Sequence, residues 1–310
     1  MKALLLSTYQ QQSIAQYLVT GLRQRIGTCE YFALTNDQQE NLERFFNRNI
    51  RLSQFDRIVI EAPQVWIYQQ SLFLRQLPYL SVLCLDASYT PKDKRLLKRN
   101  LHVMPWMRFI TVEHRLVHEL NTKGYDSYWI RPTYMSSIYR VRRSGQGLKC
   151  VIYHHNNPFI QEKIQAAHPK MTVHFCQNTE ELASLLHEQD IFIYFPEEKM
   201  TTKDFAIIIR ALACGAIVLI PNPGADACLR YHWRDGKNCL FVEDWSDALN
   251  KAETLFRDQA RREVFVKYGV DLAQRFMPDK VGEMLGAALE PTVRHASDYP
   301  RKTRIFGFEL

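Results

Sequence analysis

The feature that most constrains this sequence is a rhythm of short apolar runs, each followed by a longer stretch with helical periodicity. Continuously apolar runs are typical of strands that are covered on both faces, as in a parallel sheet. In the first half, these runs are residues 2–7, 29–34, 55–62, 80–85, 108–112 and 128–131. The repeated alternation of strand and helix predicts an α/β fold with a doubly wound parallel sheet.

The rhythm breaks off near Tyr139. Residues 139–148 are basic and include two glycines, a composition typical of a linker. The pattern then restarts with apolar runs at 149–153, 171–175, 190–195, 216–220 and 239–242. We therefore predict a Rossmann-like domain over residues 1–138, a linker over 139–148, a second such domain over 149–290 and a tail over 291–310. Because open α/β sheets bind ligands beyond the carboxyl ends of their strands, a cleft between the two domains is the expected site.

The composition is that of a globular protein. Of the 310 residues, 46% are hydrophobic and 24% are charged, and no apolar run is long enough to cross a bilayer. The first apolar run is too short for a signal peptide. The seven cysteines include no CxxC pair, which argues against a zinc site or a disulfide framework. We expect buried free thiols in a soluble, cytoplasmic protein.

The charge balance is basic, with a formal net charge of +7 and a pI of about 9.0. The densest cluster is KDKRLLKR at 92–99, which is followed by Met104, Pro105, Trp106 and Met107. Basic residues beside exposed aromatic and aliphatic ones are suited to anionic lipid headgroups, so an anionic membrane surface is a possible partner. The alternative interpretation is a solvated helix face. No nucleic-acid motif is present, so we predict no nucleic-acid partner.

Five short segments of the second half occur in an order that resembles a known family. They are FCQNTEEL at 175–182, DIFIYFP at 190–196, ALACGAIV at 211–218, DGKNCLFV at 235–242 and a helical stretch from 275 to 285. Together they resemble the C-terminal domain of group 1, retaining-type glycosyltransferases of the GT-B fold. The first half is similar to that family only in its strand–helix rhythm. The resemblance implies two Rossmann-like domains that face a cleft, with the nucleotide-sugar donor held by the second and the acceptor by the first.

A helix over 203–214 is central to the implied donor site. It is apolar nearly all round, which predicts burial, and Gly215 follows where a helix end favours a left-handed residue. Thr201 and Thr202 are good N-cap residues for this helix. Its free amides and positive dipole suit a diphosphate, and Lys203 adds a cation. The alternative is that the threonines cap the helix without binding phosphate.

The sequence departs from the family at two positions of this helix. The family's donor site has two glutamates separated by seven residues, and the register places Thr202 and Arg210 there. Arginine has donors only, so Arg210 cannot accept a hydrogen bond from a ribose hydroxyl. Either the donor is held differently, with Arg210 pairing a phosphate or a carboxylate, or the donor is unusual, or catalysis has been lost. The first explanation is the one that we favour.

Polar loops of the second domain supply further candidates for donor contact. Histidine and asparagine donate to phosphate oxygens, and amide side chains at strand ends are placed to meet a nucleobase. No acidic or cysteine partner lies at ligand spacing from the adjacent histidines, so no metal site is predicted. Each residue has an alternative role as a loop residue or helix cap. The candidates are His154, His155 and Asn156 for the diphosphate, and Gln177, Asn178 and Pro196 for the nucleobase.

Three residues of the first domain are candidates for catalysis because they follow strand ends. They are Glu61, Asp86 and His114, the last preceded by Glu113. The resemblance implies that a retaining enzyme passes the acceptor's proton to the donor phosphate. An inverting enzyme would instead need one of these side chains as general base. The sequence leaves both outcomes open, and each residue also has a structural interpretation.

The sequence thus predicts a metal-independent, hexosyltransferase-like glycosyltransferase that needs no cofactor besides its nucleotide-sugar substrate. The resemblance and the basic surface favour polysaccharide biosynthesis, with a glycan or lipid-linked acceptor of the surface polysaccharide or lipopolysaccharide type. The expected location is the cytoplasm, with peripheral binding to the inner face of the membrane. Two alternatives stay open, a non-catalytic protein of the same fold and a sugar-nucleotide epimerase.

Overall fold

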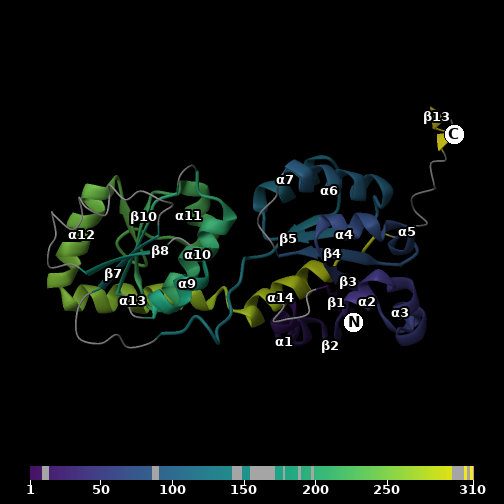
Figure 1. Cartoon of the computed structure of the whole chain (residues 1–310), viewed down its shortest axis with the longest axis horizontal. Coiled ribbons are helices and arrows are strands. Elements are labelled where there is room, and N and C mark those ends of the chain that lie inside the picture. Colours follow the sequence, from purple (N-terminus) through teal and green to yellow (C-terminus); the bar gives the residue numbers. More distant parts are fainter. Residues whose placement is uncertain are drawn as a thin grey trace. The chain divides into compact units, whose positions relative to one another are not determined.

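The computed structural model describes residues 1–8, 14–85, 91–141, 149–153, 172–176, 179–187, 190–196, 199–294, 304–305 and 308–309. The chain divides into two compact units (Figure 1). The first unit combines Met1–Pro132 with Pro278–Leu310, and the second is Thr133–Met277. Each unit has its own parallel sheet, as the alternating pattern predicts.

The first unit contains a six-stranded parallel sheet in the order β2-β1-β3-β4-β5-β6. Within it, Ser7 at the end of β1 pairs with Glu61 at the end of β3. The carboxyl ends of these strands therefore lie at one edge of the sheet. The strands are β1 (Lys2–Ser7), β2 (Thr28–Ala33), β3 (Arg57–Glu61), β4 (Leu80–Cys84), β5 (Arg108–Thr111) and β6 (Ser127–Trp129).

Helices of the first unit cover both faces of this sheet. On one face lie α1 (Ile14–Ile26) and α14 (Pro278–Leu289), which contribute to one core cluster with β1. The helices that contribute to the cluster on the other face are α3 (Leu42–Asn49), α4 (Gln64–Gln69), α5 (Ser71–Leu74), α6 (Pro91–Val103) and α7 (His114–Thr122). The short helices α2 (Asn36–Glu40) and η1 (Leu52–Gln54) complete the unit.

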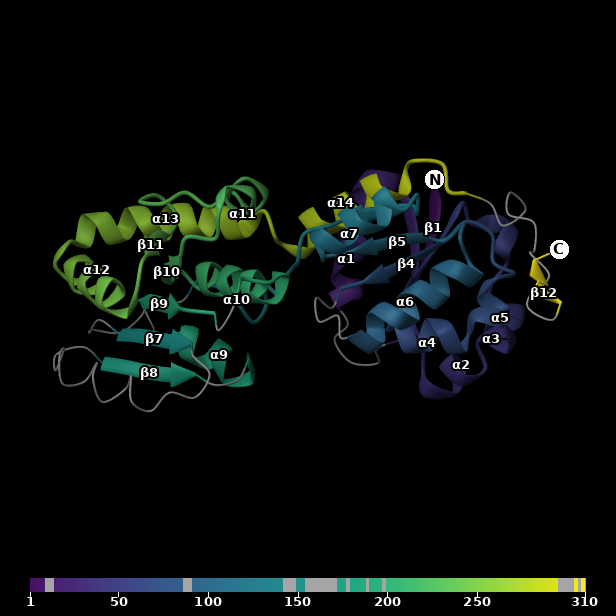
Figure 2. The same cartoon turned by 90° about the horizontal axis from the view of Figure 1, so that it is seen from above.

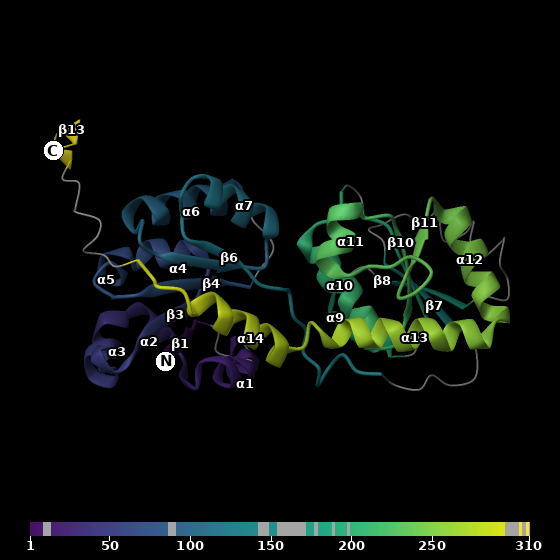
Figure 3. The ribbon, with the colours of Figure 1, turned by 180° about the vertical axis from the view of Figure 1, so that it is seen from behind.

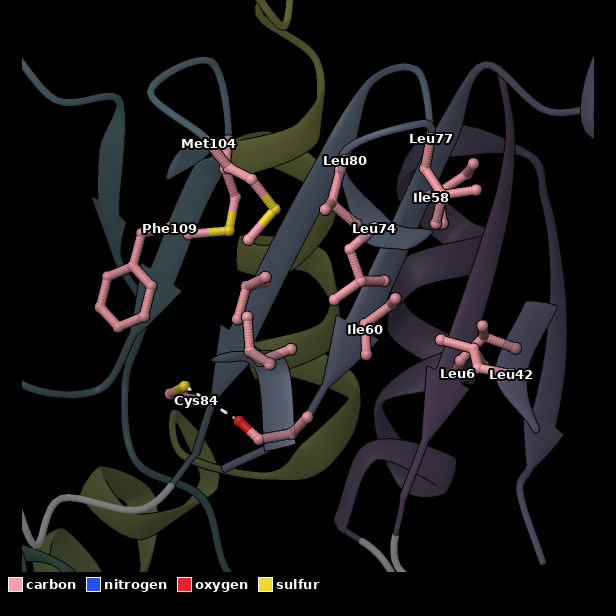
Figure 4. Close-up of a cluster of buried hydrophobic side chains, with 14 of the residues drawn as sticks. Leu6, Leu42, Ile58, Ile60, Leu74, Leu77, Leu80, Cys84, Met104 and Phe109 are labelled. Atoms are coloured by element: carbon pink, nitrogen blue, oxygen red, sulfur yellow. Dashed lines mark hydrogen bonds between the residues drawn. The ribbon is translucent and has the colours of Figure 1, made fainter. Parts of the chain in front are cut away.

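The two core clusters follow the alternation of side chains along each strand. Leu4 and Leu6 belong to one cluster, whereas Ala3 and Leu5 belong to the other. Figure 4 shows the first of these clusters, in which Leu6 and Ile60 lie near Leu42 and Leu74 from the covering helices. Both faces of the sheet are thus apolar, which explains why the strands are continuous apolar runs in the sequence.

Glycines allow α14 to pack very closely against α1 (Figures 1 and 3). A Cβ atom at Gly282 would overlap the carbonyl oxygen of Leu18, and one at Gly21 would overlap that of Asp279. At Gly286, a Cβ would come within 2.7 Å of the side chain of Arg25. The two helices can approach this closely only because these positions carry no side chain.

Two arginines hold the end of α14 on the first unit. Arg108 is buried and donates hydrogen bonds to the carbonyls of Ala288 (2.8 Å), Pro291 (2.9 Å) and Thr292 (3.0 Å). It also forms an ion pair with Asp126 at 2.9 Å. Arg57 adds a hydrogen bond to the carbonyl of Leu289. The two guanidinium groups donate to carbonyl groups at the negative end of the helix, where no further turn supplies backbone N–H donors.

The second unit has a five-stranded parallel sheet in the order β11-β10-β9-β7-β8, which Figure 2 shows from above. Its strands are β7 (Lys149–Tyr153), β8 (Thr172–Cys176), β9 (Ile191–Tyr194), β10 (Ile217–Pro221) and β11 (Leu240–Val242). Its helices are α9 (Thr179–Leu186), α10 (Thr202–Ala213), α11 (Ala225–Tyr231), α12 (Trp245–Arg257) and α13 (Gln259–Gln274). A separate short hairpin pairs β12 (Arg304–Ile305) with β13 (Phe308–Glu309).

The expected burial and the expected termini of α10 are confirmed. Most of its residues are buried, including Ile207, Ile208 and Ile209. Thr201 is the N-cap, and Gly215 follows the C-terminus with a φ of 84°, which only glycine adopts without strain.

The boundaries of the units differ from those expected from the sequence. The expected second domain extended to residue 290, whereas α14 packs on the first unit. At the other boundary, the second unit begins at Thr133, whose hydroxyl donates to the carbonyl of Phe276 at 2.7 Å. Tyr139 is already buried, and residues 142–148 of the expected linker lie outside the described residues.

The apolar residues beside the basic cluster do not face solvent. Met104, Trp106 and Met107 are buried in the core of the first unit, which corrects the suggestion that they rest on lipid. They are buried because α6 ends there and the chain turns into β5. The seven cysteines are all free, and burial raises the pKa of the Cys29 thiol to about 11. In the described part of the chain, no helix is long and apolar enough to span a membrane.

Replacing Gly282 with alanine tests the close packing of α1 and α14. Helix propensity alone would stabilise the variant by about 1 kcal/mol. The overlap with the Leu18 carbonyl is expected to outweigh this gain. We therefore expect the free energy of unfolding of the variant to be lower by about 1–3 kcal/mol. Chemical denaturation measures the difference. The control is Ala287→Gly at an exposed position of the same helix, which reports propensity alone, and a stabilised Gly282→Ala variant would contradict the packing.

Candidate functional site

Both sheets have the strand order in which ligands bind at a topological switch point. In each unit the first strand lies between the second and the third. The connection from the first strand to the second therefore runs to one side of the first strand, and the next connection crosses back to its other side. A crevice opens at the carboxyl ends of the first and third strands of such a sheet. These strands are β1 and β3 in the first unit, and β7 and β9 in the second. Functional side chains are therefore expected at these two places.

Ser7 and Glu61 occupy the switch point of the first unit. The hydroxyl of Ser7 donates a hydrogen bond of 2.7 Å to the carboxylate of Glu61, and both side chains are buried. The amide of the next residue, Thr8, donates to the carbonyl of Glu61 at 3.3 Å. The structure thus places one predicted catalytic residue, Glu61, where a ligand is expected. A carboxylate oriented in this way can accept a proton or a hydroxyl group's hydrogen bond.

A buried polar cluster beside Glu61 was not anticipated from the sequence. The side-chain amide of Gln64 donates to the sulfur of Cys84 at 2.9 Å, and that of Asn100 donates to the side-chain oxygen of Gln64, also at 2.9 Å. The thiol of Cys84 donates in turn to the carbonyl of Ala62 at 3.3 Å (Figure 4). The cluster ties α4 and α6 to the ends of β3 and β4. It fixes the loop that follows Glu61.

Other predicted residues of the first unit lie elsewhere along the edge. His114 is the first residue of α7, and its ring packs edge-on against Trp129 with 5.7 Å between ring centres. Glu113 caps the same helix by accepting a hydrogen bond from the amide of Arg115. Because β4 and β5 follow β3 in the sheet, His114 is not brought to the switch point with Glu61. Asp86 lies outside the described residues.

The N-terminus of α10 follows the third strand of the second unit and is closed by a capping box. The carboxylate of Asp204 accepts hydrogen bonds from the amide and hydroxyl of Thr201, at 2.6 and 2.8 Å. The hydroxyl of Tyr194, at the end of β9, donates to the other carboxylate oxygen. Asp204, which sequence analysis missed, therefore places a negative charge at the positive end of the helix.

The predicted phosphate contacts at the N-terminus of α10 differ in their exposure to solvent. Thr202 is buried, whereas the side chain of Lys203 is exposed. Within the described residues, the amides of Thr202 and Lys203 have no hydrogen-bond acceptor. An anion at this helix would therefore meet two free amides and one cation, with the carboxylate of Asp204 opposing it.

Arg210 lies in the last turn of α10 and makes contacts of its own. It lies eight positions after Thr202 in the sequence, which corresponds to about 12 Å along a helix axis. Its guanidinium lies 5.4 Å from the ring centre of Tyr139. Burial raises the pKa of Tyr139, and the charge of Arg210 opposes that shift. Arg210 thus holds the segment that opens the second unit against α10, and no carboxylate pairs with it among the described residues.

The remaining predicted donor contacts fall largely outside the described residues. This applies to His154, His155, Asn156, Gln177 and Asn178. The strands that precede them end together, because Tyr153 of β7 pairs with both Cys176 of β8 and Tyr194 of β9. Pro196 lies two residues after the end of β9 and is half-buried. In the described part of the chain, no group of three His, Cys, Asp or Glu residues is arranged to hold a metal ion.

Comparisons of the sequence find no relatives. No protein-family model matches the chain, and no curated protein is similar to it in sequence.

Comparisons of the structure do find similar proteins. HepE from Anabaena in complex with UDP is 11% identical, with a TM-score of 0.56 over 94% of this chain and 100% of HepE. The β-glucosyltransferase of T4 phage in complex with UDP-glucose is 9% identical, with a TM-score of 0.54 over 94% and 100% of the two chains. TarM is 10% identical, with a TM-score of 0.53 over 80% of this chain and 57% of TarM. This chain therefore has the fold of GT-B glycosyltransferases, as the segments of its second half predict.

Proposed function

We propose that this protein is a glycosyltransferase that takes a sugar from a uridine diphosphate donor. The observation that carries the proposal is the likeness to HepE and the T4 phage enzyme along 94% of the chain. Both of those structures contain UDP or UDP-glucose. The fold alone does not fix an activity, so the proposal also depends on which polar groups this chain places at its two switch points.

The second unit is the proposed donor-binding part. Its parallel strands β7, β8 and β9 end side by side, and the first turn of α10 follows with the exposed Lys203 and two amides that bond to no described residue. These groups would stabilise the leaving diphosphate without a metal ion. His154, His155 and Asn156 follow β7 and remain proposed phosphate contacts, as Gln177, Asn178 and Pro196 remain proposed nucleobase contacts.

Arg210 is assigned a positioning role instead of a phosphate contact. Its guanidinium lies over Tyr139, and it is about two turns away from the helix N-terminus. The absence of both family glutamates therefore removes the usual ribose acceptor without replacing it at the same place. We propose that acceptors from the loops after β7 and β8 hold the ribose.

The first unit is the proposed acceptor-binding part, and Glu61 is its proposed general base. In the reaction, the acceptor oxygen forms a bond to the anomeric carbon as the bond from that carbon to the diphosphate breaks. The acceptor's proton passes to the carboxylate of Glu61, and UDP leaves. Ser7 orients the carboxylate through its 2.7 Å hydrogen bond. Asp86 and His114 are the alternative bases, and His114 lies farther along the sheet edge.

Substitution of Glu61 by glutamine tests this assignment. We expect the variant to release UDP from UDP-glucose, with water or an added glycan as acceptor, at least ~100-fold more slowly than the unmodified protein, because it cannot accept the proton. Binding of UDP should be unchanged. The control is Glu113→Gln, which alters a helix cap only.

The outcomes separate the competing functions. A full rate for Glu61→Gln would remove Glu61 from the mechanism. No turnover of any nucleotide sugar by the unmodified protein would favour a non-catalytic protein of the same fold. Formation of a new nucleotide sugar without an acceptor would favour an epimerase.

We further propose that the protein works at an anionic membrane surface, in the synthesis of a surface polysaccharide or lipopolysaccharide. The support is the cationic face of α6, where Lys92, Lys94, Arg95, Lys98 and Arg99 are all exposed. Partly exposed apolar side chains accompany it on the neighbouring helix α4, namely Val65 and Tyr68, and Arg99 lies 5.6 Å from the ring centre of Tyr68. Cations next to an amphipathic aromatic ring are suited to lipid headgroups.

Charge reversal at Lys92 and Arg95 tests the membrane proposal. Each basic residue near an anionic surface contributes about 1 kcal/mol, so Lys92→Glu/Arg95→Glu should weaken binding to phosphatidylserine-containing vesicles by roughly 30-fold or more. Vesicle sedimentation at low salt measures the difference. The control Lys199→Glu/Lys267→Glu changes the net charge equally at exposed positions of the second unit. Equal losses in both variants, or no vesicle binding by the unmodified protein, would contradict the proposal.

A further inference from the structure

A groove on the first unit lies outside the sites described above. It has a volume of about 610 Å³, which is within the range of small-molecule sites. It is bordered by α2 and α3 on one side and by the end of α4 with α5 on the other. Its lining residues are Glu40, Asn41, Leu42, Glu43, Arg44, Asn47, Arg48, Gln69, Gln70, Leu72 and Phe73.

Most polar side chains of the groove are not committed to contacts within the protein. Asn41 donates to the carbonyl of Asp37, and Gln70 donates to that of Gln39. The other six form no hydrogen bond or ion pair with any described residue, so their donors and acceptors are open to a ligand. These six are Glu40, Glu43, Arg44, Asn47, Arg48 and Gln69.

The charges of the groove point to an uncharged ligand. Its two glutamates and two arginines cancel in formal charge, in contrast to the purely cationic face of α6. The remaining polar groups are amides, which both donate and accept hydrogen bonds. Leu72, which is 77% exposed, and Phe73 provide an apolar surface beside them. Closely spaced hydroxyl groups on an otherwise apolar ring match this combination, and sugars have that chemistry.

Hydrogen bonds connect the groove to the switch point of the first unit. The side-chain amide of Gln70 donates to the carbonyl of Gln39 at 3.3 Å, and that of Gln39 donates to the carbonyl of Thr8 at 2.6 Å. The amide of Thr8 is bonded to the carbonyl of Glu61. The wall of the groove is therefore joined by hydrogen bonds to the backbone that carries Glu61.

We propose that the groove binds the non-reacting sugars of an uncharged oligosaccharide whose terminal hydroxyl is the acceptor. The proposal rests on the proposed function for the role of acceptor, but binding of the oligosaccharide itself requires only the groove. Asn47, on α3, and Gln69, at the end of α4, face the ligand from opposite sides. The amides of both side chains donate to and accept from its hydroxyl groups.

The test is an array of immobilised di- to hexasaccharides, both uncharged and acidic, probed with the whole protein. We expect binding to at least one uncharged oligosaccharide, and at least ~10-fold weaker binding by Asn47→Ala/Gln69→Ala, because two amide side chains are lost. The matched control is Gln24→Ala/Asn250→Ala, which removes the same groups at exposed positions of α1 and α12. Thermal unfolding of all variants verifies that they are folded.

Binding of UDP, measured on the same proteins, separates this proposal from the proposed function. The groove proposal is overturned if no uncharged oligosaccharide binds, if the Asn47/Gln69 variant binds like the control, or if only acidic glycans bind. It is supported if that variant loses oligosaccharide binding and keeps UDP binding. If the unmodified protein binds oligosaccharides through the groove but does not bind UDP, the glycan site stands and the transferase proposal fails.

Discussion

The first unit depends on how the buried guanidinium of Arg108 is satisfied. It pairs with Asp126 and donates to three carbonyls around the end of α14, so it joins β5 to a helix from the other end of the chain. An uncompensated charge in this position would cost several kcal/mol, which makes the correct docking of α14 a condition for folding. Once docked, α14 and α1 cover one face of the sheet that carries Ser7 and Glu61. The docking of α14 thus completes the cover of one face of the sheet whose edge carries the candidate site.

The sequence predicts local features of this fold well because local physics determines them. Continuous apolar runs mark strands buried on both faces, Thr201 caps α10, and Gly215 takes the left-handed conformation that ends it. The sequence does not reveal which sheet α14 covers, because its apolar face would suit either core. The burial of Trp106 is also hidden, since an aromatic residue beside a basic helix has the same pattern whether it faces lipid or the core.

In the candidate site, too, the sequence predicts residues that depend on local structure but does not predict contacts between residues far apart in the chain. The sequence predicts Glu61 as a site residue because residues at the ends of parallel strands gather at one edge of the sheet, which is a property of the fold class. The cluster of Gln64, Cys84 and Asn100 was missed, because amides on helices and a thiol at a strand end carry no signal until they meet. The contact of Arg210 with Tyr139 joins residues distant in the sequence, and only the structure shows that this arginine is engaged. The polar groove on α3 to α5 likewise arises from helices that are separately unremarkable.

The proposed function requires the second unit to bind a uridine diphosphate sugar. The most direct measurement is the thermal unfolding of the whole protein with UDP, UDP-glucose, GDP, ADP and CMP at equal concentrations. We expect UDP and UDP-glucose to raise the unfolding temperature and the other nucleotides to raise it less. A ligand at 100 times its dissociation constant stabilises the folded state by about 2.7 kcal/mol. No shift with the uridine nucleotides at millimolar concentration, or an equal shift with all five compounds, would contradict the claim.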